Sequence, residues 1–123
     1  MSKKILIADD EDDLRLLLKD MFKGLPYDIT FVRNGEEAIK MLDKLKLDLA
    51  ILDISMPKLG GYEVCRHMKS DSILKHIPII ILSAFTRDKQ GSKADLAECY
   101  MHKPFEQDLL LAEVRKLLNE PAA

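Results

Sequence analysis

Short apolar runs alternate with longer segments of helical spacing along the whole chain. Ala50–Leu52 and Ile79–Leu82 contain no polar residue, which is typical of strands that are covered on both faces, as in a parallel sheet. Five strands are expected, over Ile5–Ala8, Ile29–Val32, Leu47–Leu52, Pro78–Leu82 and Cys99–His102. The second and the fifth of these patterns are the weakest.

The segments between the runs carry apolar residues three and four positions apart, which is the spacing of one helix face. The first such segment is Glu11–Lys23, and Gly24 and Pro26 end it. Further helices are expected over Glu36–Leu45, after Gly60-Gly61 and over Glu106–Asn119. A poorer pattern fills Thr86–Ala97, where Leu96 is the one large aliphatic residue. We expect a short or broken, mobile helix there, because it has little apolar surface to pack.

The alternation of strands and helices predicts one α/β domain over residues 1–123, a (βα)5 parallel sheet with helices on both faces. The chain has the length of a single domain, and its 47% hydrophobic and 33% charged residues argue against disorder and against a membrane protein. In such a sheet, ligands bind beyond the carboxyl ends of the strands. Chemistry is therefore expected where the strands end.

Charge and cysteine content narrow the function and the location. A net charge of −2 leaves no broad cationic face for nucleic acid or anionic lipid. The apolar run Ile5–Ala8 is too short for a signal-peptide core or a membrane span. Cys65 and Cys99 form no C-x-x-C pattern and are expected to be buried free thiols in a reducing compartment. We expect a cytoplasmic domain that binds neither nucleic acid nor membrane directly.

Charged and hydroxyl residues follow four of the expected strands. They are Asp9-Asp10 after the first strand, Asp53 after the third, Ser83-Ala84 after the fourth and Lys103-Pro104 after the fifth. Because parallel strands end at the same edge of a sheet, these groups converge, and crowded carboxylates repel one another and need a cation. Asp12 and Asp13 are instead expected to cap the first helix and to complement its dipole.

The donor types favour Mg²⁺ over zinc. Mg²⁺ takes oxygen ligands, typically one or two carboxylates together with a phosphoryl oxygen and waters. The three histidines His67, His76 and His102 show no metal-ligand spacing. An EF-hand loop is excluded, because Leu14 stands where that loop needs a glycine.

Several short motifs together resemble the receiver domain of two-component response regulators. They are Asp9-Asp10, Asp53-Ile54-Ser55-Met56-Pro57, Gly60-Gly61, Ser83-Ala84, and Tyr100 before Lys103-Pro104-Phe105. Each motif is weak alone, but they occur in the family's order and the resemblance covers essentially the whole chain. It implies a doubly wound, flavodoxin-like sheet with the strand order 2-1-3-4-5 that the chemotaxis regulator shows.

The resemblance also implies a phosphorylation site and a metal site. Asp53 would be the phosphoacceptor, since a carboxylate is a competent nucleophile. Asp10 would bind Mg²⁺ directly and Asp9 through water, while Asp53 and the backbone carbonyl of Ser55 would complete the protein ligands. Mn²⁺ is expected to substitute for Mg²⁺.

The remaining motifs would bind and report the phosphoryl group. By resemblance, Lys103 would pair with a phosphoryl oxygen, and a cis Pro104 would hold its turn. The Ser83 hydroxyl and the Ala84 backbone N–H would donate to the phosphoryl group. Tyr100 would be the switch residue that follows Ser83 inward.

The partners implied by the resemblance are a sensor histidine kinase or phosphotransfer protein as donor, and an output protein or domain. The output partner would contact the face made by the fourth helix, the fifth strand and the fifth helix. No enzyme activity is expected beyond self-phosphotransfer and autodephosphorylation.

Three other functions differ from this one in identifiable residues. An aspartate-nucleophile phosphatase usually carries a second acid two residues after its nucleophile, where this chain has Ser55. A flavodoxin-like binder needs a phosphate loop rich in hydroxyls and glycine after the first strand, where this chain has acids. A receiver that is never phosphorylated would lack Asp9, Asp10, Asp53 or Lys103, and all four are present. Ser83 replaces the family's usual threonine, which keeps the hydroxyl.

Overall fold

The computed structural model describes residues 3–54, 56, 58–83 and 97–119. Its elements are β1 (Lys3–Ala8), α1 (Asp12–Phe22), β2 (Tyr27–Val32), α2 (Gly35–Lys44), β3 (Leu49–Asp53), α3 (Gly61–Lys69), the 3₁₀-helix η1 (Leu74–His76), β4 (Ile79–Ser83), β5 (Cys99–His102) and α4 (Gln107–Leu117). All five expected strands are present, and the expected fifth helix is α4. Residues 86–96 of the helix expected over Thr86–Ala97 lie outside the described residues, and so does its expected mobility.

The five strands form one parallel sheet in the order β2-β1-β3-β4-β5. This order confirms the 2-1-3-4-5 topology that the resemblance implies. The strands end in register: Ala8 lies beside Leu52, Asp53 beside Leu82 and Ser83 beside His102. The carboxyl ends of β1, β3, β4 and β5 therefore meet at a single edge of the sheet.

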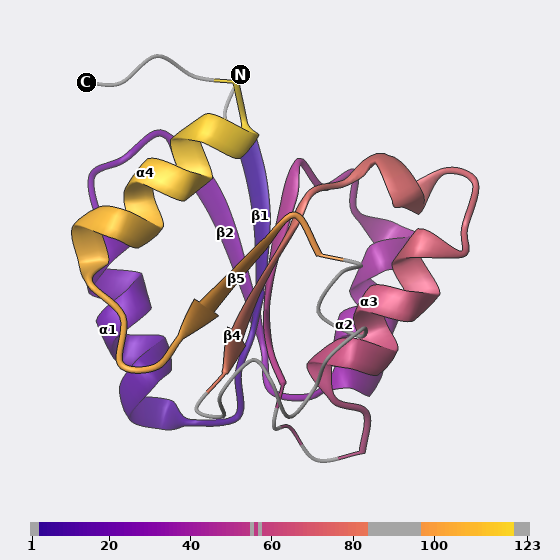
Figure 1. Ribbon diagram of the computed structural model, residues 1–123. Coiled ribbons are helices and arrows are strands. Elements are labelled where there is room, and N and C mark those ends of the chain that lie inside the picture. Colours follow the sequence, from indigo (N-terminus) through magenta and orange to yellow (C-terminus); the bar gives the residue numbers. More distant parts are fainter. Residues whose placement is uncertain (1–2, 55, 57, 84–96, 120–123) are drawn as a thin grey trace.

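Helices cover both faces of the sheet (Figure 1): α1 and α4 lie on one face, and α2 and α3 on the other. Alternate residues of β1 point to the two sides, so that Ile5 and Ile7 pack with α1 and α4 while Leu6 and Ala8 pack with α2 and α3. Every residue of β3 and β4 is buried. Burial on both faces explains why the runs in these two strands contain no polar alternation.

The first helix lies where the sequence predicts it, but its N-cap residue differs from the expectation. Glu11 is its N-cap residue, but the Glu11 side chain makes no capping hydrogen bond to the helix, and Asp12 and Asp13 lie in the first turn. The expectation that Asp12 and Asp13 cap the helix is wrong. Asp12 instead forms an ion pair with Arg15, three residues further along the helix, and both acids remain placed to complement the helix dipole.

Two glycines shape the turn between β3 and α3. The Gly61 N–H donates to the Ile54 carbonyl at 3.2 Å. A Cβ atom at Gly61 would collide with the backbone carbonyl oxygen of Asp53, and one at Gly60 would collide with that of Ile54. Only glycine lets the start of α3 pack this closely behind Asp53.

An ion pair joins the end of α3 to the residue just before β5. Lys69 Nζ lies 2.7 Å from Glu98 Oε2. The other carboxylate oxygen of Glu98 accepts the Ile79 N–H at 2.8 Å, and the Glu98 N–H donates to the Ile79 carbonyl at 3.0 Å. The start of β5 is thereby held against β4 and α3.

Both cysteines are free thiols, Cys65 buried and Cys99 half-buried. The expectation that both are buried holds for Cys65 and not for Cys99, which lies on the edge strand β5. Burial raises the pKa of both thiols to about 11. Among the described residues, none of the helices has the length and apolar character needed to cross a lipid bilayer.

Candidate functional site

Four strands deliver the candidate site residues to one edge of the sheet. Asp9 directly follows β1, Asp53 is the last residue of β3, Ser83 is the last residue of β4, and Lys103 directly follows β5. The Lys103 N–H donates to the Ser83 carbonyl at 2.6 Å, which continues the pairing of β5 with β4 beyond the end of the strand. The strand ends that the sequence singled out are therefore neighbours.

Three aspartates gather at this edge. Oxygens of Asp9, Asp10 and Asp53 all lie within 4.8 Å of one another. Asp9 is 0% exposed and Asp53 is 2% exposed, whereas Asp10 is exposed to solvent. Among the described residues this is the one group of three or more acidic, histidine or cysteine side chains with metal-binding spacing, and it contains no histidine. The prediction that these three acids converge is confirmed.

Lys103 is the cation of the cluster. Its Nζ lies 3.1 Å from Asp53 Oδ2, 3.5 Å from Asp9 Oδ2 and 3.3 Å from Glu11 Oε1. Burial by itself lowers the pKa of Lys103, but the charges of Asp53 and Asp9 outweigh it, so the pKa is raised overall. The ammonium therefore stays charged and offsets part of the repulsion among the acids.

The two oxygens of Asp9 differ in their surroundings. Asp9 Oδ1 accepts the Glu11 N–H at 2.8 Å. Asp9 Oδ2 is buried, and it accepts no hydrogen bond from the described residues. Burial raises the pKa of Asp9, and the Glu11 N–H and Lys103 reduce this effect only in part. A buried carboxylate oxygen with unused acceptor capacity, beside two other acids, fits a hard cation such as Mg²⁺.

The other predicted residues are placed as follows. Ser83 is fully buried. Tyr100 is half-buried and packs against the core on the α2–α3 side. It lies close to Tyr62 of α3, whose pKa is raised by burial and by interaction with the Tyr100 hydroxyl. The Lys103–Pro104 peptide bond is cis, as expected. Ser55 and Ala84 lie outside the described residues.

Two further residues at the site were not singled out from the sequence. Glu11 contacts Lys103 with its carboxylate and Asp9 with its backbone N–H. Arg15 donates from Nη1 to the Asp9 carbonyl at 2.8 Å. The spacing of Asp12 and Arg15, three residues apart on a helix, is the signal that could have indicated an anchored arginine.

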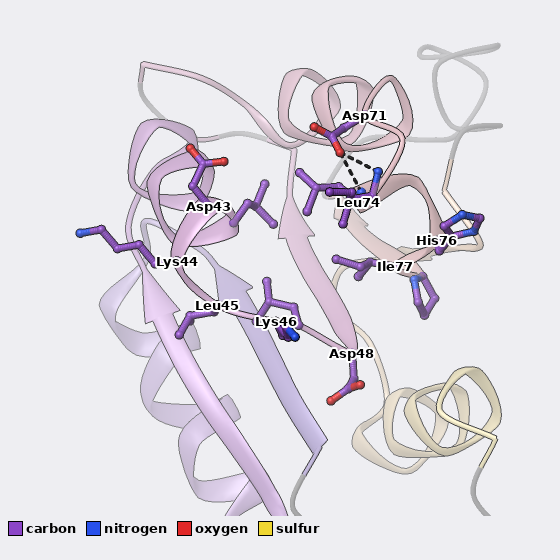
Figure 2. A pocket seen from close by; sticks show the side chains of 13 residues that line it. Asp43, Lys44, Leu45, Lys46, Asp48, Asp71, Leu74, His76 and Ile77 are labelled. Atoms are coloured by element: carbon purple, nitrogen blue, oxygen red, sulfur yellow. Dashed lines mark hydrogen bonds between the residues drawn. The ribbon is translucent and has the colours of Figure 1, made fainter.

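A pocket of about 640 Å³ lies away from these residues, at the opposite edge of the sheet (Figure 2). It is lined by the connection from α2 to β3 and by η1 and the residues leading into β4. One wall is fixed by Asp71, whose carboxylate accepts the N–H groups of Ile73 and Leu74 at 2.8 and 3.0 Å. None of the clustered acids lines this pocket, so we place the candidate site at the carboxyl edge.

Known proteins resemble this chain over nearly its full length. Residues 5–115 match the family described as the response regulator receiver domain. The alkaline phosphatase synthesis transcriptional regulatory protein PhoP of Bacillus subtilis is 37% identical over 97% of this chain and 50% of its own length. This chain thus spans about half the length of that relative. The polar-differentiation response regulator DivK of Brucella anthropi is 29% identical over 98% of this chain and 99% of its own length.

Solved structures show the same fold and family. The response regulator TrrA of Thermotoga maritima, crystallised in complex with Mg²⁺ and BeF, matches with a TM-score of 0.84 and 37% identity over 94% of this chain and 98% of that one. The receiver domain of a signal transduction histidine kinase from Syntrophus aciditrophicus matches with a TM-score of 0.89 and 31% identity over 96% of this chain and 91% of that one. The chain therefore belongs to the response regulator receiver domain family.

Proposed function

We propose that this chain accepts a phosphoryl group on Asp53 from a phospho-histidine of a sensor kinase or phosphotransfer protein, in a reaction that requires Mg²⁺. The observation that supports this best is the setting of the Asp53 carboxylate. It is buried at the end of β3, lies 3.1 Å from Lys103 Nζ, and lies within 4.8 Å of oxygens of Asp9 and Asp10.

The transfer is a displacement at phosphorus. A carboxylate oxygen of Asp53 forms the new P–O bond, the P–N bond to the donor imidazole breaks, and its electron pair returns to the ring nitrogen. Little covalent chemistry is left for the protein, so positioning and charge neutralisation dominate. Lys103 already contacts Asp53 and can pass to a phosphoryl oxygen with little movement.

The metal would be held by Asp9, Asp10 and Asp53, together with the backbone carbonyl of Ser55. When bound, Mg²⁺ neutralises negative charge on the transferring group. Asp10, which is exposed, would bind the ion directly, and Asp9, which is buried, would bind it through water. Mn²⁺ prefers the same oxygen donors and should replace Mg²⁺.

The output would be a population shift. A phosphoryl group bound by Ser83, the Ala84 N–H and Lys103 favours the conformation in which Ser83 is drawn in and Tyr100 is buried. Reversing an equilibrium from mostly inactive to mostly active takes about 5.5 kcal/mol of differential affinity, which several charge-assisted hydrogen bonds and a metal can supply. The partner surface we propose is the face formed by segment 86–97, β5 and α4.

The proposal places the chain in signalling rather than in metabolism. We infer that it turns over no external substrate and that it loses its phosphoryl group only by hydrolysis of the phospho-aspartate or by return to a donor. The two free thiols agree with the reducing cytoplasm in which we place it.

The experiment that tests this is intact-mass spectrometry of the chain after incubation with acetyl phosphate. The wild type should gain one phosphoryl group with Mg²⁺ present and none in excess EDTA. Asp53→Asn preserves the shape of the side chain and removes the nucleophile, so it should gain none. Asp43→Asn, an exposed aspartate at the opposite edge, is the matched control and should be labelled like the wild type. Labelling of Asp53→Asn to the wild-type level would show that the phosphoacceptor is another residue.

A further inference from the structure

Arg15 reaches from the second turn of α1 back to the acidic site. Its side chain is 14% exposed. Nη1 donates to the backbone carbonyl of Asp9 at 2.8 Å, and Nη2 is bound by the carboxylate of Asp12. A planar guanidinium can donate to two acceptors in fixed directions at once. Here the Asp12 carboxylate holds the Arg15 guanidinium in place, and the guanidinium in turn holds the Asp9 carbonyl.

The carbonyl that Arg15 binds belongs to the peptide unit between Asp9 and Asp10. This unit connects a buried carboxylate to an exposed one, and its orientation decides where the two side chains point. On the other side of Asp9, the backbone N–H is already fixed, since it donates to the Val32 carbonyl at 3.0 Å. Arg15 therefore supplies the restraint on the carbonyl side.

We propose that Arg15 is a positioning residue for the acidic site: held by Asp12, it fixes the Asp9–Asp10 peptide and with it the directions of the two carboxylates. The inference rests on the proposed function in one respect, namely that Asp9 and Asp10 are ligands of Mg²⁺. Arg15 touches neither the metal nor the phosphoryl group in this scheme and acts only through the backbone.

Positioning and simple electrostatics predict opposite results when Arg15 is removed. A guanidinium near a cation site repels the cation, so on Coulomb grounds its loss should tighten Mg²⁺ binding. If Arg15 instead orients the ligands, its loss should weaken binding, because groups that orient metal ligands typically contribute about 10- to 100-fold in affinity. The sign of the change separates the two.

The test is a titration of the ¹⁵N-labelled, unphosphorylated full chain with MgCl₂, followed by amide chemical shifts. We expect Arg15→Gln to bind Mg²⁺ about tenfold more weakly than the wild type. Its Asp10 amide, which belongs to the released peptide unit, should also shift before any metal is added. Arg15→Lys retains a cationic donor without the planar fork and should recover part of the affinity. If Arg15→Gln fails to fold, the weakening in Arg15→Lys carries the test.

Two further variants make the result interpretable. Arg33→Gln removes an exposed arginine beside the same surface depression as Arg15, and it should leave Mg²⁺ affinity unchanged or slightly higher. Asp10→Asn tests the metal site itself. Loss of binding in Asp10→Asn with wild-type or tighter binding in Arg15→Gln would overturn the role of Arg15 alone, whereas wild-type binding in Asp10→Asn would overturn the proposed metal site.

Discussion

Lys103 faces carboxylates that come from two strands and from the start of a helix, those of Asp53, Asp9 and Glu11. Buried carboxylates are strongly unfavourable unless they are paired, and one ammonium cannot balance them fully. The metal-free site is therefore left with surplus negative charge. This surplus charge favours the binding of a divalent cation at the carboxyl edge of the sheet. It also means that Lys103 can leave Asp53 and pair with a phosphoryl oxygen after phosphorylation.

The surplus charge has a measurable cost in stability. Asn at position 9 keeps an oxygen that can accept the Glu11 N–H, and it removes a buried charge that is incompletely compensated. We expect Asp9→Asn to raise the free energy of unfolding in EDTA by on the order of 1 kcal/mol. Urea unfolding measures this change. Mg²⁺ should stabilise the wild type and have much less effect on the variant.

Asp10→Asn is the matched control for Asp9→Asn. The same chemical change is made one residue away, on a side chain that water already solvates, so the stability of the metal-free protein should barely change. A metal-free Asp9→Asn protein that is less stable than the wild type would mean that the Asp9 charge is well compensated by Lys103.

At the level of elements, η1 depends on a single side chain. The Asp71 carboxylate accepts the N–H of Ile73, the residue just before this short helix, and the N–H of Leu74, its first residue. This is the role that a capping side chain plays. The N–H of Leu74, followed by that of Ile73, lowers the pKa of Asp71. The element that leads into β4 and walls the opposite pocket is therefore sensitive to acid.

The sign of this sensitivity follows from the direction of the shift. A carboxyl whose pKa is lower in the folded state than its ordinary value of 3.8 stabilises the fold above that value, and the contribution disappears as the pH falls through the lower folded pKa. Asp71→Asn keeps an acceptor but cannot ionise. In urea unfolding at a series of pH values, the stability advantage of the wild type over Asp71→Asn should shrink below about pH 4.

Asp43→Asn, on the rim of the same pocket, controls for the general loss of a carboxylate. If the difference in free energy of unfolding between the wild type and Asp71→Asn stays constant as the pH falls below about 4, the charge of Asp71 contributes nothing to capping.

The elements were predictable from the sequence where one physical signal dominates. Uninterrupted apolar runs located β3 and β4, because strands buried on both faces have no polar side. The segment of α1 was predicted to within a residue, but its N-cap residue was predicted wrongly. Any acid in a run of five can cap a helix, and the backbone of Glu11 and the pairing of Asp12 with Arg15 decide which one does. Local sequence does not contain that choice.

At the scale of the whole molecule, the position of the site could be predicted but not its contacts. Strand order and parallel direction place Asp9, Asp53 and Lys103 together. Strand order and direction do not predict that the Glu11 carboxylate contacts Lys103 from the N-cap of α1, or that Arg15 donates to the Asp9 carbonyl. Both contacts depend on how α1 meets the end of β1, which is a tertiary property.

The edge strand β5 is fastened by charge at both of its ends, through Glu98 with Lys69 at its start and through Lys103 with Asp53 at its finish. The central strands are instead held by apolar burial. Dissolved salt weakens ion pairs by screening their charges, but it does not weaken apolar packing. At 1 M NaCl the Debye length is about 3 Å, which weakens the partly exposed Lys69–Glu98 pair at the start of β5 more than the more deeply buried Lys103–Asp53 pair. Apolar packing is left intact or stronger.

Ionic strength should therefore be an input to this receiver in its own right, one that loosens β5 while the rest of the sheet stays closed. In amide hydrogen exchange, β5 should lose protection between low salt and 1 M NaCl by a larger factor than β1 or β3 does. Equal changes in all three strands would mean that β5 is held by packing alone. If β5 alone responds, ionic strength alters this strand in the unphosphorylated protein. Because β5 carries Tyr100 and belongs to the surface we propose for the output partner, that surface would then depend on salt concentration as well as on phosphorylation.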